Sequence, residues 1–211
     1  MRPKRIDSFR VFVATLRRAS AAPRRLLLAG AVALAASAAS LAAADAAGSR
    51  AASFHWFAAG PAPAAWSHDA LPSGAATLSY PTTFTSGNDE DGISRERKDR
   101  HGTILVYLDV TPQQGQERLK GWASYRVKVV EAESKDVHED GHATGLTFRG
   151  GKGSCVLDDY RTRVENHHYR EIACFVQGRQ HASVLIAAAL ESQWAHAVKT
   201  LERAVDAYRV S

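Results

Sequence analysis

The sequence predicts an α+β domain in which a mostly antiparallel sheet is covered by two main helices. Short apolar runs rich in β-branched residues recur between residues 75 and 189, and polar connections separate them. Two other segments, at about 116–133 and 193–208, place their apolar residues at helical spacing. The resulting order is two strands, a helix, four strands and a helix, which is typical of an α+β domain.

Composition divides the 211 residues into four parts: a basic lead at 1–25, an apolar segment at 26–44, an Ala/Pro/Gly linker at 45–72 and the domain at 73–211. The lead carries eight Lys and Arg residues and one Asp, a net charge of +7. Because the whole chain carries only +5, the remaining residues sum to −2. A nucleic-acid-binding domain needs a positive excess of its own, so no nucleic-acid partner is predicted.

The segment 26–44 has no charged residue and follows the basic lead, an order typical of an export signal. Ala44-Asp45-Ala46 offers a cleavage site, whereas the length of the segment also suffices to span a bilayer. Two alternatives follow: a single-pass anchor with its N-terminus inside, or secretion after cleavage near Ala46. In both, positive charge stays in the cytoplasm and the C-terminal domain lies outside.

The first strands are expected at Ala75–Tyr80, before Pro81, and at Thr103–Thr111, whose nearly continuous apolar run suits a central strand. Residues 86–102 are polar and charged, which favours a loop or an irregular hairpin. In the helix predicted at about 116–133, apolar residues fall at helical spacing with charged residues between them. The apolar set is Leu119, Trp122, Ala123, Val127 and Val130, and the charged set is Lys120, Arg126, Lys128 and Glu131.

The second half of the domain is predicted as a strand at Ala143–Arg149, a turn at 150–153 and an antiparallel meander. The turn has the sequence GGKG but lacks the spacing of a phosphate-binding loop. The meander strands are Ser154–Arg163, His168–Val176 and His181–Ala189. Gln193–Tyr208 is the closing helix, with Ser192 as its expected N-cap.

The two cysteines, Cys155 and Cys174, are the only ones in the chain, and an even count in an exported protein predicts a disulfide. Direct pairing of the two would centre the hairpin turn at Val164-Glu165. The polar residues place that turn slightly later, at 165–167, so either the turn or the direct pairing must shift. A disulfide also argues against Cys155 acting as a nucleophile with His167 or His168 as its base.

The stretch His138-Glu139-Asp140-Gly141-His142 matches the H-E-x-x-H pattern of zinc hydrolases. That chemistry needs both histidines one helical turn apart, and the Asp-Gly centre favours a turn entering a strand instead. The third ligand position of one such class holds Phe148, and Met1 is the only methionine, so the Met-turn of that class is impossible. A solvated polar loop is therefore expected, with zinc binding by His138 and His142 as the alternative.

Two further pairs, Asp158-Asp159 and His167-His168, could form a divalent-metal site on the hairpin. Neighbouring residues of a strand point to opposite faces, so each pair could contribute only one member. Solvation at the surface is the prediction for both pairs.

Three features together resemble the PsbP/Mog1-type α/β/α sandwich over about residues 66–210. They are Tyr80-Pro81 at the end of the first strand, Trp122 in the middle helix, and Trp194 at the start of the closing helix that follows the meander. The resemblance implies that fold and a non-enzymatic binding or accessory role, and it supplies no catalytic residues.

The sequence thus predicts a non-catalytic extracytoplasmic domain without a cofactor. Its partner would be a small ligand, an envelope component or another protein, and the membrane as well if residues 26–44 are retained. The alternative is the zinc-dependent hydrolase that would use residues 138–142.

Overall fold

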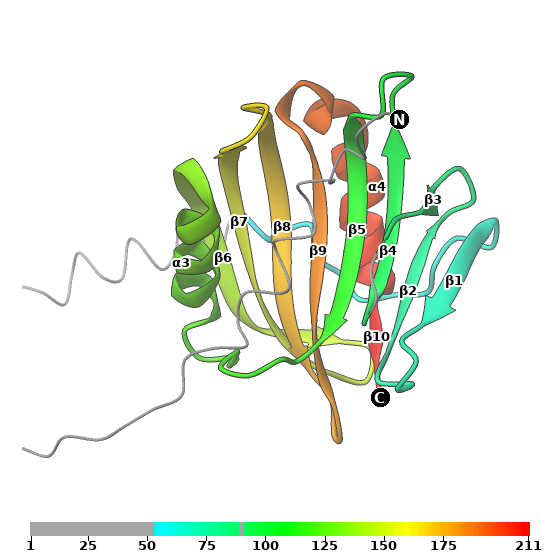
Figure 1. Cartoon of the computed structure of the whole chain (residues 1–211). Coiled ribbons are helices and arrows are strands. Elements are labelled where there is room, and N and C mark those ends of the chain that lie inside the picture. The colour runs from blue at the N-terminus through cyan, green and yellow to red at the C-terminus, as the bar shows by residue number, and fades with distance from the viewer. Residues whose placement is uncertain (1–52, 89–90) are drawn as a thin grey trace, which may run out of the picture. The chain divides into compact units, whose positions relative to one another are not determined.

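The computed structural model describes residues 53–88 and 91–211, and its centre is a seven-stranded sheet with the order β3-β4-β5-β9-β8-β7-β6 (Figure 1). Every pair of neighbours is antiparallel, as predicted. The strands are β3 (Thr85–Ser86), β4 (Ile93–Lys98), β5 (Ile104–Pro112), β6 (Ser134–Phe148), β7 (Gly151–Thr162), β8 (His168–Gln177) and β9 (Ala182–Leu190).

A helix packs on each face of this sheet, which makes the architecture an α/β/α sandwich. Helix α3 (Trp122–Glu133) lies over β6, β7 and β8, whereas α4 (Glu191–Ala207) lies on the opposite face, behind β9 and β5 in Figure 1. A small second sheet, with the order β1-β2-β10, packs beside α4. It consists of β1 (Trp66–Ala70), β2 (Ala76–Pro81) and β10 (Arg209–Val210).

The alternation of side chains along the strands produces one apolar core under each helix. Under α3, the Trp122 ring packs on Val156 and Phe175, and its Nε1 donates a hydrogen bond to the carbonyl oxygen of Ala173 at 2.9 Å. Under α4, the larger core includes Leu201 and both cysteines. The fold class and the two covering helices are therefore as predicted.

The disulfide between Cys155 and Cys174 is confirmed, and the two residues are direct cross-strand partners of β7 and β8. The hairpin closes with the amide of Thr162 donating to the carbonyl oxygen of His167. The turn therefore occupies residues 163–166, earlier than the polar residues suggested, and direct pairing is correct.

Residues before 73, where the domain was expected to start, already belong to the fold. Phe54 is buried in the main core, and the amide of Ala58 donates to Asp206 Oδ1 at 2.8 Å. Strand β1 also lies within the expected linker, because pairing with β2 stabilises a polar segment that has no strand pattern of its own. The predictions for residues 1–25, 26–44 and 45–52 concern residues outside those described.

The starts of both helices also differ from the prediction. Helix α3 begins at Trp122 and not near residue 116, since Gly121 precedes it with a left-handed φ of 82°. Helix α4 begins at Glu191, so Ser192 lies inside it and is not the N-cap. Of the two alternatives for residues 86–102, the structure has the irregular hairpin: β4 pairs with β3, and Arg95 of β4 forms an ion pair with Asp69 at 2.6 Å. Over residues 53–88 and 91–211, neither helix is both long and apolar enough to cross a bilayer.

Candidate functional site

Strands β7 and β8 carry polar side chains on both faces of the sheet, because consecutive residues alternate. Asp158 and Glu171 point toward α3 and are direct cross-strand partners. The next pair, Asp159 and Arg170, points toward the opposite layer. We call the first group the buried charged cluster and the second the histidine–aspartate face. The buried charged cluster is Tyr107, Arg126, Asp158, Tyr160 and Glu171, and the histidine–aspartate face is His138, Asp140, Asp159, His168 and Arg170.

The centre of the buried charged cluster is a two-point ion pair between Arg126 and Glu171. The Arg126 Nε donates to Glu171 Oε1 at 2.7 Å, and Nη2 donates to Oε2 at 3.0 Å. Both side chains are buried, with 7% and 0% of their surface exposed. Arg126 is thus not on a solvated face of the helix, where a charged residue between apolar ones is usually found. The ion pair joins α3 to the middle of the sheet.

Asp158 lies beside this ion pair but takes no part in it. Its side chain is buried, and neither carboxylate oxygen has a hydrogen-bond partner among the described residues. Burial, followed by the charge of Glu171, raises the pKa of Asp158 well above its usual range, while Arg126 opposes this shift. The neutral form is therefore favoured. Surface solvation, which the sequence predicted for Asp158, is wrong.

Two tyrosines complete the cluster. The hydroxyl oxygens of Tyr107 and Tyr160 lie 3.0 Å apart, and the Tyr160 ring stacks on Tyr169. Burial raises the pKa of all three phenols, so they remain protonated and can donate hydrogen bonds. Tyr169 uses its hydroxyl to donate to the carbonyl oxygen of Ile104 at 2.8 Å.

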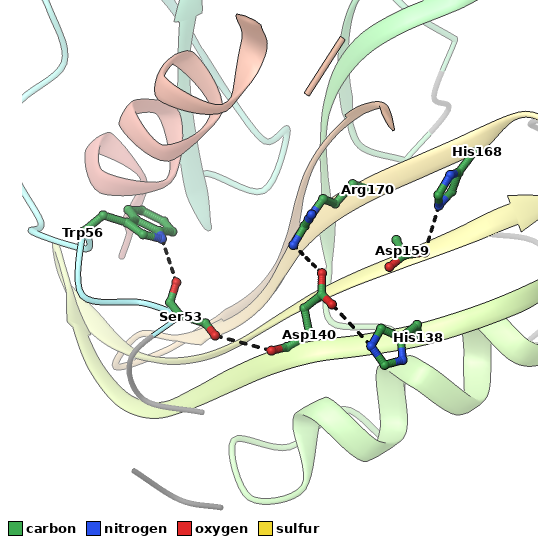
Figure 2. A network of polar contacts seen from close by, with 7 residues as sticks. All are labelled: Ser53, Trp56, His138, Asp140, Asp159, His168 and Arg170. Carbon is green, nitrogen blue, oxygen red and sulfur yellow. Dashed lines mark hydrogen bonds and ion pairs between the residues drawn. The ribbon is translucent and has the colours of Figure 1, made fainter. Parts of the chain in front are cut away.

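The histidine–aspartate face brings together residues of β6, β7 and β8, as Figure 2 shows. His168 Nε2 lies 2.8 Å from Asp159 Oδ1. Arg170 forms an ion pair with Asp140, whose other carboxylate oxygen lies 3.5 Å from His138 Nε2. His138 is 72% exposed, and the other four side chains are partly exposed. Solvent therefore reaches this face, unlike the buried charged cluster.

Aromatic and N-terminal residues border the same face. The Arg170 guanidinium lies 5.4 Å from the centroid of the Trp194 ring, a distance suited to a cation–π contact. Ser53 donates to the carbonyl oxygen of Asp140 at 3.4 Å, and Trp56 Nε1 donates to the carbonyl oxygen of Ser53 (Figure 2). A partly exposed tryptophan beside charged and imidazole groups is an arrangement that can bind a polar partner.

The H-E-x-x-H match lies on β6 and not on a helix. The expected polar loop is also wrong, because the stretch pairs along β7 with a register shift between Glu139 and Gly141. Glu139 Oε1 lies 2.6 Å from His142 Nδ1, whereas His138 contacts Asp140. The one-turn spacing that zinc hydrolases use is not present. Within residues 53–88 and 91–211, no group of three or more His, Cys, Asp or Glu residues is arranged to hold a metal ion.

Metal analysis tests the zinc alternative directly. The purified wild-type protein is expected to carry no stoichiometric zinc, and the His142→Ala variant is expected to have the same low content. One zinc ion per wild-type chain that is lost in His142→Ala would contradict this expectation, because His142 would then be a ligand. Elemental analysis after dialysis against zinc gives the measurement.

The structure also places the other candidate residues that the sequence offered. Cys155 is oxidised, so its sulfur cannot attack a substrate. Of the two neighbouring pairs, Asp159 and His168 come together while Asp158 points to the opposite face, as the alternation required. His167 instead lies 3.6 Å from Glu165 in the hairpin turn.

The buried charged cluster was missed, although the sequence contained a signal for it. Trp122, Arg126 and Val130 are four residues apart, so a helix that buries both apolar residues also buries the arginine. Glu171 likewise alternates with Tyr169 and Ala173 on β8, which are both buried. A strand that faces the core on that side must bury the acid.

Comparisons with known proteins concern the fold. The chain matches no protein-family model and no curated protein sequence. Among solved structures it is similar to CyanoP, the PsbP of Synechocystis sp. PCC 6803, with 13% identity and a TM-score of 0.46 over 72% of this chain and 96% of that one. It is also similar to Mog1, with 14% identity and a TM-score of 0.47 over 69% and 95%.

A third similar structure is LpqN of Mycobacterium tuberculosis, which is described as involved in cell envelope biogenesis. Its identity is 12% and its TM-score 0.44, over 71% of this chain and 86% of that one. The PsbP and Mog1 types that the sequence resembles are thus both among the similar solved structures. At these identities the likeness concerns the fold and assigns no ligand or activity.

Proposed function

We propose that the protein is a non-catalytic binding or accessory domain that acts outside the cytoplasm. The observation that carries this proposal is the disulfide between Cys155 and Cys174, which lies in the sheet with both residues fully buried. Structural disulfides persist in oxidising compartments and are rare in the cytoplasm. An export signal at residues 26–44 would deliver the domain to such a compartment.

A retained apolar segment would keep the domain close to the membrane. Residue 53 already contacts β6, so only the eight residues 45–52 separate the apolar segment from the described domain. Eight extended residues span at most about 28 Å. A membrane-tethered form would therefore work on partners within the same envelope layer, and a cleaved form would be released from this limit.

The histidine–aspartate face is the binding surface that we favour for the unidentified partner. It is partly exposed, it combines both signs of charge, and Trp194 borders it. Polar residues beside a tryptophan are common where proteins bind small polar ligands or other proteins. The partner classes remain those expected from the sequence: a small ligand, an envelope component or a protein.

Localisation of the full chain with a C-terminal tag tests the proposal. When the outer layer of the cells is permeabilised and the cytoplasmic membrane stays intact, the tag is expected to be accessible to protease. The two cysteines are expected to resist alkylation under denaturing conditions without reductant. A matched chain without residues 1–44 should stay inside and react with alkylating reagent at both thiols. A protease-protected, reduced full chain would contradict the proposal. Fractionation then separates the two forms, since an uncleaved chain sediments with membranes and a cleaved one does not.

A further inference from the structure

Two acids and one base meet at the interface between α3 and the sheet, and they do not balance. Arg126 uses two donors on Glu171, one for each carboxylate oxygen. Asp158 lies directly opposite Glu171 on the neighbouring strand, fully buried, and neither of its oxygens has a hydrogen-bond partner among the described residues. A buried carboxylate without a counter-ion is far more costly than a buried neutral carboxyl. This interface is therefore built for one ionised acid and one neutral acid.

Among the described residues whose charges act on Asp158, Arg126 is the one that favours its ionised form. The base near Asp158 is Arg126 of α3, and the acids are Glu171 of β8, Glu139 of β6 and, on the opposite face of the sheet, Asp159 of β7. Glu139 is bonded to His142. The phenol of Tyr107, on β5, lies against that of Tyr160 on β7. The three neighbouring acids disfavour a charge on Asp158, and Arg126 is already bound by Glu171.

We propose that Asp158 is a buried proton-binding site, which keeps its proton while Arg126 binds Glu171, and that loss of this proton weakens the packing of α3 on the sheet. The geometry decides which acid holds the proton, because Glu171 has two guanidinium donors and Asp158 has none. Ionised Asp158 would repel Glu171 and compete for Arg126, and Arg126 is the charged link between α3 and the sheet. This inference goes beyond the proposed function and does not depend on it.

The dependence of stability on pH follows from the direction of the shift. The pKa of Asp158 is higher in the folded state than in the unfolded state, where it is about 3.9. At a pH below the unfolded-state pKa, the group makes its full contribution to stability. That contribution is constant at low pH and is lost as pH rises through the folded-state value. The unfolding equilibrium constant is expected to rise by up to about ten-fold per pH unit between the two pKa values, since one proton is involved.

The experiment compares the full wild-type chain with Asp158→Asn and with Asp159→Asn as a matched control. Asparagine has nearly the shape of a protonated aspartic acid but cannot ionise. Asp159 is the next residue on the same strand, it is partly exposed, and it faces the opposite layer. Denaturant unfolding from about pH 4, near the unfolded-state pKa of Asp, up to alkaline pH gives the stability, and infrared spectroscopy detects the carbonyl band of a protonated carboxyl group.

Asp158→Asn is expected to remove the one-proton loss of stability with rising pH, and Asp159→Asn is expected to retain it. The wild type and Asp159→Asn should show a protonated-carboxyl band at neutral pH that Asp158→Asn lacks. Identical pH slopes in the wild type and Asp158→Asn would overturn the proposal, as would a missing carboxyl band in the wild type. An Asp158→Asn chain that does not fold would overturn it as well, because a neutral isostere should be accepted.

Discussion

Replacing Arg126 with leucine is expected to destabilise the domain by about 3–5 kcal/mol. This is the largest loss that we expect from the replacement of a single buried charged residue. The substitution keeps an apolar stem on α3 but leaves the Glu171 carboxylate buried without a counter-ion. It also removes the positive charge that counteracts the upward pKa shift of the neighbouring Asp158, so this carboxyl group becomes still harder to ionise. Denaturant unfolding of the full chain, followed by circular dichroism, measures the loss.

Two controls separate an unpaired charge from a lost contact. Lys128→Leu changes an exposed lysine of the same helix and is expected to alter stability by less than about 0.5 kcal/mol. The double variant Arg126→Leu/Glu171→Leu removes both charges and is expected to recover much of the loss, because an apolar pair can replace a buried ion pair. Equal losses in the single and double variants would show that packing, and not the unpaired acid, is responsible.

Replacing both cysteines with alanine is expected to cost about 3 kcal/mol, as estimated from the loop that the disulfide closes. Cys155 and Cys174 are 19 residues apart in sequence and fully buried, so the change also removes apolar contacts in the larger core. The loss is measured as the difference in unfolding free energy between the oxidised wild type and the double variant.

Reductant provides the matched control for that variant. It should lower the stability of the wild type and leave Cys155→Ala/Cys174→Ala unchanged. Thiol titration of denatured, unreduced wild type should find about zero free thiols per chain. Two free thiols, or a wild type insensitive to reductant under denaturing conditions, would contradict the role given to the disulfide.

The elements that the sequence predicted well are those whose own residues determine their structure. Strands β5, β8 and β9 consist largely of apolar residues, so their pattern is visible without knowledge of their neighbours. Strands β1 and β4 contain charged and polar residues and are held as strands by their partners, β2 for β1 and β3 and β5 for β4. Arg95 of β4 also forms an ion pair with Asp69 of β1. Such pairing depends on the tertiary structure and leaves no periodic signal in either segment.

The site was less predictable because the same residue types serve different roles on opposite faces. Alternation correctly predicted that Asp158 and Asp159 would separate, but not that the first would be buried. That outcome depends on α3, which places Arg126 and the apolar residues around it over β7 and β8. The motif at 138–142 has the H-E-x-x-H pattern that zinc hydrolases carry on a helix, but here the segment is a strand, because it pairs with β7.

The order of the strands in the sheet also constrains when each part of the domain can fold. Strands β6, β7, β8 and β9 pair with their neighbours in sequence, so this half can form through local contacts, and its cysteines can be oxidised as soon as β8 is available. Strand β5 instead pairs with β9, across the segment that contains α3 and three strands. Long-range pairing of this kind is slow and exposes unpaired edges. If the chain crosses a membrane from its N-terminus, β5 must therefore wait with an open edge until β9 emerges, which makes it the segment that most needs protection during export.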